Sequence, residues 1–255
     1  MRLSLILALS SLCPAQTHSV RLAELSWKEA GGALTPGAVV MIPLGAESKE
    51  HGPHLKLSND HVMAEFLADQ VMHRTAVVVA PTINYHYYPA FVDYPGATSL
   101  RFETARDLVV DICRGLARFG PRRFYVLNTG VSTVRPLEAA VAELAKDGIT
   151  LRYTDLLKAD AAVESEIKQE KEGTHADEIE TSEMLYIAPQ SVDMKLAAKD
   201  FPKGSPFQWK DPNAPGYSPS GIYGDATLAT RAKGEKIVKA EVDYIVRDIE
   251  ALRAK

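Results

Sequence analysis

The chain has 255 residues, of which 46% are hydrophobic and 24% are charged, which is the composition of an ordinary globular protein. Its formal charge of −4 and its pI near 6.0 argue against a nucleic-acid-binding protein, because such domains usually carry a strong basic excess. The sequence contains no apolar run of about 18 residues, so it predicts no membrane span.

The first 15 residues have the pattern of a secretory signal peptide. Arg2 supplies a positive charge, residues 3–12 form an apolar stretch, and Cys13 and Ala15 place small side chains before a cleavage site after Ala15. We therefore expect an exported protein, periplasmic or secreted, with one domain over residues 16–255. The alternatives are a short buried N-terminal helix and a lipoprotein cut at Cys13.

Short β-rich runs alternate along the chain with segments of helical periodicity. Residues 38–44 form a nearly continuous apolar run, as a buried parallel strand requires, and Asn59 or Asp60 is expected to cap the helix that follows. The other predicted elements are strands over 75–80, 122–128 and 149–153, helices over 103–119, 136–146 and from Gly234 onward, and a Pro- and Gly-rich loop over 202–221. This rhythm predicts one α/β domain with a mainly parallel β-sheet flanked by helices, and with reactive groups at the carboxyl ends of its strands.

A dense polar cluster follows the first of these strands. Within residues 47–61 it contains two glutamates, three histidines and an aspartate, namely Glu47, Glu50, His51, His54, Asp60 and His61. Carboxylate and imidazole groups suit zinc, manganese and similar divalent ions, and the Gly52-Pro53 pair favours a tight loop that can turn several donors towards one point. The cluster therefore predicts a metal site. The alternative is a solvated loop with a charged helix cap.

A second polar cluster spans residues 174–182. It is typical of a helix start, at which Asp177 or Thr174 can cap the helix and acidic side chains complement the helix dipole. That role is sufficient for Asp177 and Glu178. It explains His175 and Glu180 less well, so we treat these two residues as functional candidates.

Four separated segments, spread from about residue 38 to the C-terminus, resemble the creatininase (creatinine amidohydrolase) family. The first segment is the Pro-Leu-Gly strand end followed by Glu-His-Gly-Pro-His-Leu at 50–55 and by an Asp nine residues after His51. The second is Tyr85 with Tyr-Pro-Gly-Ala-Thr at 94–98. The third is His-Ala-Asp-Glu-Ile-Glu-Thr-Ser at 175–182, and the fourth is the Gly-x-x-Gly-Asp stretch that begins at Gly221. The resemblance implies an α/β sandwich that often assembles as a hexamer. It also implies a metal-dependent hydrolase that opens or cleaves non-peptide C–N bonds, as in creatinine or formamides.

The resemblance also implies which residues form the site. Glu50, His51, Asp60 and Glu180 would bind one or two zinc or manganese ions, with His51 and Asp60 keeping the family spacing and Asp60 able to bridge two ions. His175 would deliver a proton to the leaving nitrogen. Glu180 could instead orient His175.

Two departures from the family pattern affect this metal site. The family has its first Glu two residues before the His, where this chain has Lys49, so a bulge could bring either Glu47 or Glu50 to the metal. The family also has a ligand His after the third predicted strand, where this chain has Gly130. We expect the loss of an imidazole to weaken at least one metal position.

Two classes of function follow from these observations. The first is an amidohydrolase of a small amide-type substrate, which holds a single ion or uses His54 or His86 in place of the missing ligand. The second is a non-catalytic ligand-binding protein that kept the scaffold after losing a metal ligand. The sequence does not name the substrate.

Overall fold

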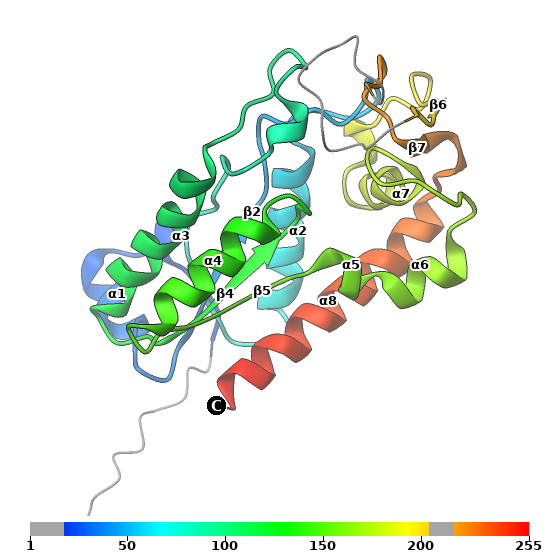
Figure 1. The fold of residues 1–255 in the computed structure, drawn as a ribbon. Helices are drawn as coiled ribbons and strands as arrows, with labels where there is room; N and C mark the ends of the chain where they lie inside the picture. The colour runs from blue at the N-terminus through cyan, green and yellow to red at the C-terminus, as the bar shows by residue number, and fades with distance from the viewer. Residues whose placement is uncertain (1–17, 204–216, 255) are drawn as a thin grey trace, which may run out of the picture.

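The computed structural model describes residues 18–203 and 217–254, so the predicted signal peptide and most of the predicted loop over 202–221 lie outside the described residues. Five parallel strands form one sheet in the order β1-β3-β2-β4-β5, with helices on both faces (Figure 1). The strands are β1 (Val20–Arg21), β2 (Val39–Leu44), β3 (Val78–Val79), β4 (Arg123–Asn128) and β5 (Thr150–Tyr153), and a separate antiparallel pair consists of β6 (Lys199–Asp200) and β7 (Gly224–Asp225). The predicted α/β class is confirmed, although the strand expected over 75–80 is reduced to two residues.

The helices lie in two layers. The α-helices are α1 (Trp27–Ala33), α2 (Asn59–Met72), α3 (Phe102–Ala117), α4 (Val134–Ala145), α5 (Leu156–Ala159), α6 (Ala161–Ile167), α7 (Glu178–Ile187) and α8 (Arg231–Arg253), and short 3-10 turns are η1 (Leu22–Glu24), η2 (Pro89–Phe91), η3 (Pro189–Ser191) and η4 (Ala226–Leu228). Helices α3 and α4 cover one face of the sheet, and α2 and α8 cover the other (Figure 1). None of the helices in the described ranges is long and apolar enough to cross a membrane.

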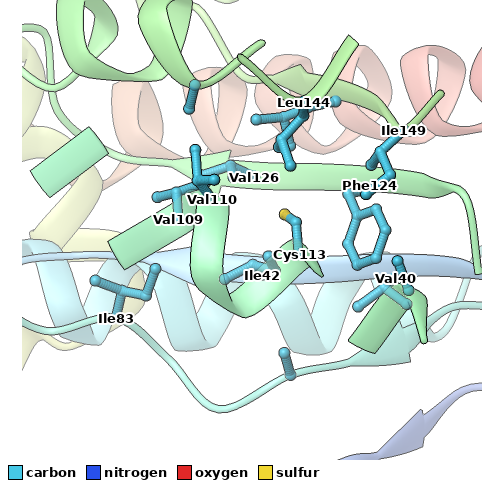
Figure 2. Packing of buried hydrophobic residues seen from close by; sticks show 14 of the residues in the cluster. Val40, Ile42, Ile83, Val109, Val110, Cys113, Phe124, Val126, Leu144 and Ile149 are labelled. Carbon is cyan, nitrogen blue, oxygen red and sulfur yellow. The ribbon is translucent and has the colours of Figure 1, made fainter. Parts of the chain in front are cut away.

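The central strand β2 is buried on both faces, which explains its continuous apolar sequence. Val40 and Ile42 pack with Phe124 and with Cys113 of α3 in one core (Figure 2). The alternating residues of the same strands point to a second core beneath α2 and α8, for example Met41. Successive side chains of a strand point to opposite faces, so a strand between two helical layers has apolar residues at every position.

The start of α2 differs from the predicted helix cap. The N-cap position is Ser58, whose side chain makes no cap hydrogen bond, while Asn59 and Asp60 are the first helical residues and are both buried. Asp60 does not cap the helix because its carboxylate is bound by Lys49 and His51. The prediction of a cap at Asn59 or Asp60 was therefore wrong, because a tertiary contact takes the side chain that a local cap would use.

The sheet topology decides where reactive groups can meet. The connection after β2 runs through α2 to β3 on one side of the sheet, and the connection after β4 runs through α4 to β5 on the other side. Strands β2 and β4 are neighbours, with Leu44 paired to Asn128 at their carboxyl ends. Ligands of open α/β sheets bind at such a switch point, so the loops after β2 and β4 are the expected location of a site.

Candidate functional site

A cavity of about 270 Å³ lies at this switch point. It is lined by Lys49 from the loop after β2, Gly130 from the loop after β4, Phe91 from η2, and His175 and Glu180 from the start of α7. Four segments that are distant in sequence therefore contribute to one hollow, and both polar clusters of the sequence reach it.

His51 is held rigidly on the loop after β2. Its Nδ1 lies 2.9 Å from the backbone oxygen of Lys49 and donates to it, while Nε2 lies 2.6 Å from Asp60 Oδ1 and 3.3 Å from Glu180 Oε1. Burial is the largest influence on His51 and would lower its pKa, but the charges of Asp60 and Glu180 and the hydrogen bond to Asp60 together outweigh burial and raise the pKa to about 9. The predicted pair of His51 and Asp60 is thus in direct contact.

His175 and Glu180 are positioned by the start of α7. The Asp177 side chain caps this helix by accepting from the amides of Ile179 and Glu180, at 3.0 and 3.1 Å. Ala176, which lies between the histidine and the cap, has φ +48°, and its N–H donates to Glu180 Oε2 at 2.6 Å. The left-handed backbone at Ala176 turns the chain so that the side chains of His175 and Glu180 face the same point.

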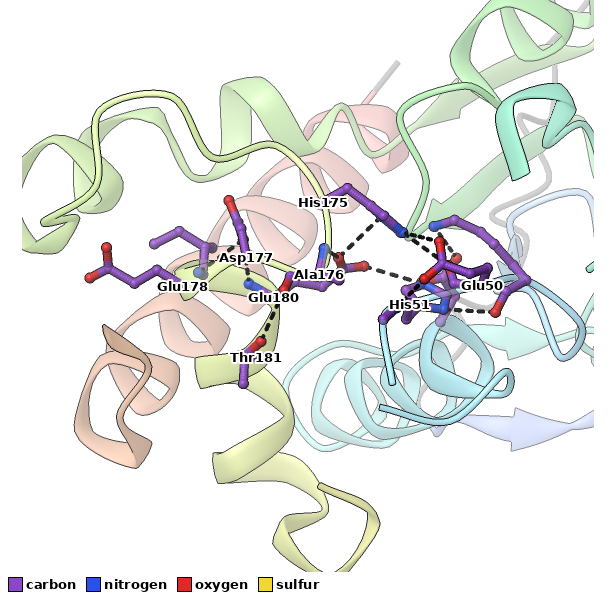
Figure 3. Close-up of polar contacts among 12 residues, drawn as sticks. Glu50, His51, His175, Ala176, Asp177, Glu178, Glu180 and Thr181 are labelled. Carbon is purple, nitrogen blue, oxygen red and sulfur yellow. Dashed lines mark hydrogen bonds and ion pairs between the residues drawn. The ribbon is translucent and has the colours of Figure 1, made fainter. Parts of the chain in front are cut away.

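The His175 ring is bound on both of its nitrogens (Figure 3). Nε2 donates to the backbone oxygen of Glu50 at 2.9 Å and lies 3.2 Å from Glu50 Oε2, whereas Nδ1 lies 3.5 Å from Glu180 Oε2. The ring also packs on Phe91, with 4.4 Å between the ring centroids. Nδ1 is therefore the nitrogen of His175 that faces the carboxylate of Glu180.

Lys49 occupies the position at which the family pattern has its first Glu. Its Nζ lies 2.9 Å from Asp60 Oδ2, and both side chains are almost fully buried, with 7% and 1% exposed. Glu50 instead binds the amide of Gly52 and contacts His175, and Glu47 accepts a hydrogen bond from Asn84 at 2.7 Å. Of Glu47, Lys49 and Glu50, it is Lys49 whose side chain contacts Asp60.

The two histidines considered as replacement ligands bind elsewhere. His54 Nε2 shares a hydrogen bond of 2.8 Å with Thr181 Oγ1 of α7, and His86 Nε2 donates to the backbone oxygen of Ala105 in α3 at 3.0 Å. Burial lowers the pKa of each to about 4, so both are neutral near pH 7. Neither is among the described residues that line the cavity, so neither takes the place of a ligand at Gly130.

The donor set fits one divalent ion. His51, His175 and Glu180 each offer a ligand atom, and these atoms lie within 4.8 Å of one another. Two imidazoles with a carboxylate suit zinc and manganese. Each ring is oriented through its other nitrogen by a backbone carbonyl, which is the outer-shell arrangement common in metal sites. Two of the predicted ligands, Glu50 and Asp60, lie outside this group of three, and Asp60 contacts it through His51.

A second group of acids escaped the sequence analysis. Asp160, Glu183 and Glu241 are buried, and their carboxylate oxygens lie within 4.8 Å of one another. Asp160 and Glu183 line the same cavity as His175. Glu241 follows Val238 and precedes Val242 and Ile245, so it interrupts the apolar face of α8; that interruption is the signal that could have identified it.

Comparison with known proteins agrees with the fold. The creatininase (creatinine amidohydrolase) family model matches residues 23–249. The chain is 31% identical over 249 residues to the creatinine amidohydrolase of Pseudomonas putida, covering 90% of this chain and 95% of that one. It is 29% identical to the 3-dehydro-scyllo-inosose hydrolase of Thermotoga maritima, with 83% and 77% of the two chains covered. A solved structure of a creatininase variant described as Zn–Zn type superimposes with a TM-score of 0.77 at 29% identity, over 92% of this chain and 98% of that one. The chain therefore belongs to the creatininase family.

Proposed function

We propose that the protein is a metal-dependent hydrolase that cleaves a non-peptide C–N bond in a small amide, lactam, cyclic amidine or formamide. The observation that supports this most is the convergence of the ligand atoms of His51, His175 and Glu180 within 4.8 Å of one another. Two of these residues, His175 and Glu180, line the cavity. The cavity volume of about 270 Å³ is at the small end of ligand pockets and suits a small molecule. Relatives named as hydrolases of creatinine and of an inosose support hydrolysis in general, and they differ in substrate.

In this proposal His51, Asp60 and Glu180 hold the ion. His175 also offers a ligand atom in the group described above, but here its Nδ1 stays off the ion and transfers the proton. A bound divalent ion polarises a carbonyl group and makes hydroxide available near pH 7. The Nδ1 of His175, which faces Glu180 and the cavity, delivers a proton to the leaving nitrogen. Glu50 holds the other ring nitrogen, so the ring keeps one orientation while the proton moves.

A non-catalytic binding protein is the second candidate. Lys49 and Gly130, at the positions where the family pattern has a Glu and a His, favour it. The Glu and the His of the family pattern are metal ligands, so their replacement here reduces the number of protein groups available to a metal. The two candidates differ in whether a metal-loaded protein turns over any substrate.

The test is a hydrolysis panel on protein loaded with zinc or manganese. It contains creatinine, simple lactams, primary amides and formamides, and the release of amine or ring-opened product is measured. We expect turnover of at least one member, and we expect His175→Ala to lower kcat by about 10²- to 10⁴-fold. His73→Ala, at an exposed position at the end of α2, is the matched control and should keep full activity. Specific binding without any turnover would favour the binding protein.

We also propose that the protein is exported after removal of residues 1–15 and that it assembles as a hexamer. The apolar stretch near the N-terminus supports export, and the family resemblance supports the hexamer.

A further inference from the structure

We propose that the ammonium group of Lys49 fills one of two cation positions in this centre, so that the protein takes up one divalent ion per chain. The proposal rests on the metal site of the proposed function and deepens it. It contrasts this chain with the creatininase variant described as Zn–Zn type.

The first argument is the division of Asp60 between two partners. A carboxylate that bridges two cations offers one oxygen to each of them. Here Oδ1 faces the His51 ring at 2.6 Å and Oδ2 binds Lys49 Nζ at 2.9 Å. The lysine thus stands on the side of Asp60 that a second ion would use, and the candidate ligands of the first ion stand on the other side.

The second argument is that Lys49 is enclosed at this point. Its backbone N–H donates to the backbone oxygen of Leu57 at 3.2 Å, and its backbone oxygen accepts from His51 Nδ1 at 2.9 Å. Both backbone polar groups of Lys49 are therefore bound within the loop. The ammonium lies 5.0 Å from the centroid of the Phe91 ring and 5.8 Å from that of Tyr88, at distances typical of cation–π contacts. A second ion could enter only by displacing this buried cation.

The third argument is the balance of charge. Lys49 pairs with Asp60, and the charges of Glu180 and Glu50 also act on it. The three negative charges of these carboxylates are matched by one ammonium and one divalent ion. A second divalent ion would leave two uncompensated positive charges in a buried site if the ammonium stayed, and one if the ammonium were displaced, which is unfavourable in either case.

The fourth argument is the absence of a further donor on this side. Gly130 lines the cavity but has no side chain, and His54 and His86 are bound elsewhere. Gly130 is not among the described glycines with positive φ, and a Cβ atom there would lie 3.2 Å from the Thr133 side chain. A side chain can therefore be introduced at this position with a small movement of Thr133, which makes the proposal testable.

The experiment measures bound metal per chain. Wild type, Gly130→His and Lys49→Glu/Gly130→His are loaded with excess zinc or manganese, passed through a desalting column and analysed by elemental mass spectrometry, with folding checked by circular dichroism. We expect one equivalent in wild type, one in Gly130→His because Lys49 remains, and two in the double variant. Gly130→His is the matched control, because it restores a donor and keeps the ammonium.

The outcomes separate this proposal from the proposed function. Two equivalents in wild type or in Gly130→His would show that Lys49 does not exclude an ion, and would overturn the inference. A folded double variant that still binds one equivalent would overturn it as well. If the double variant does not fold, wild type and Gly130→His still decide the question. No bound metal in wild type would instead contradict the metal-dependent function itself.

Discussion

The acidic group of Asp160, Glu183 and Glu241 predicts an unusual dependence of stability on pH. Asp160 is 5% exposed, and its Oδ1 has no hydrogen-bond partner among the described residues. Burial, together with the charge of Glu164, raises the pKa of Asp160 to about 8 from its ordinary 3.8. Burial and neighbouring acids also raise the pKa values of Glu183 and Glu241 well above 4.5. The folded protein therefore holds protons that the unfolded chain releases.

The sign and size of the effect follow from this difference. Between about pH 4 and pH 8 the folded state binds more protons than the unfolded state, so stability decreases as the pH rises through this range. Each pH unit corresponds to about 1.4 kcal/mol for one group. If Asp160 is the group that stays protonated, the free energy of unfolding falls by up to about 4 kcal/mol between pH 4 and pH 7. If the retained protons are shared with Glu183 and Glu241, the part that belongs to Asp160 is about 2 kcal/mol.

Asp160→Asn removes this cost, because the amide carries no charge at any pH. We expect the variant to be more stable than wild type by about 2–4 kcal/mol at pH 7 and nearly equal to it at pH 4. Asp160 occupies the N-cap position of α6 but makes no side-chain cap bond, so no cap is lost. The assay is urea unfolding followed by circular dichroism at pH 4, 5.5, 7 and 8, with a chelator present.

The matched control is Glu166→Gln on the same helix. Glu166 pairs with Lys236 at 3.1 Å, but its side chain is 69% exposed, so its removal should change stability by less than about 1 kcal/mol at every pH. If Asp160→Asn and wild type show parallel pH profiles, Asp160 does not hold a proton in the folded protein. The explanation from buried, unpaired carboxyl groups would then be refuted.

Four further predictions concern the site, the helix cap and the processing of the chain. His51→Ala or Asp60→Ala should lower bound metal at least tenfold, and unchanged elemental content in both folded variants would exclude them as ligands. Asp177→Ala should lower the free energy of unfolding by about 1–2 kcal/mol, because two amides of α7 lose their acceptor; an unchanged urea midpoint would contradict this role. Protein isolated from its native host should begin after Ala15, and intact mass spectrometry that finds Met1 retained would reject export with cleavage. Light scattering should give a mass near six chains, whereas a monomer mass would reject the hexamer.

The sequence by itself determined the architecture and named the candidate residues of the site. The apolar run at 38–44 identified the central strand, because a strand covered on both faces must be apolar at every position. The resemblance to the family singled out His51 and Asp60 by their nine-residue separation, and the two side chains are in contact across the loop that leads into α2. Asp177 and Thr174 were the two candidates for the helix cap from the local pattern, and Asp177 is the cap. These are features whose physical causes lie within a short stretch of chain.

Only the tertiary structure decided which side chains of that stretch meet. Sequence analysis left Glu47 and Glu50 as alternative metal ligands, but the loop brings Lys49 to Asp60 and turns the two glutamates to other partners. It also left His86 as a substitute ligand, although that ring is buried against α3.

The acids at 160, 183 and 241 illustrate the same limit more clearly. Asp160 lies between α5 and α6, whereas Glu183 and Glu241 lie on α7 and α8, so the three share no common pattern in the chain. Backbone periodicity depends on neighbouring residues, whereas the ion pairs and buried carboxyl groups depend on how the loops and helices pack around the carboxyl ends of β2 and β4. That packing is not encoded in any one segment, which is why the fold could be predicted and the charge arrangement of the site could not.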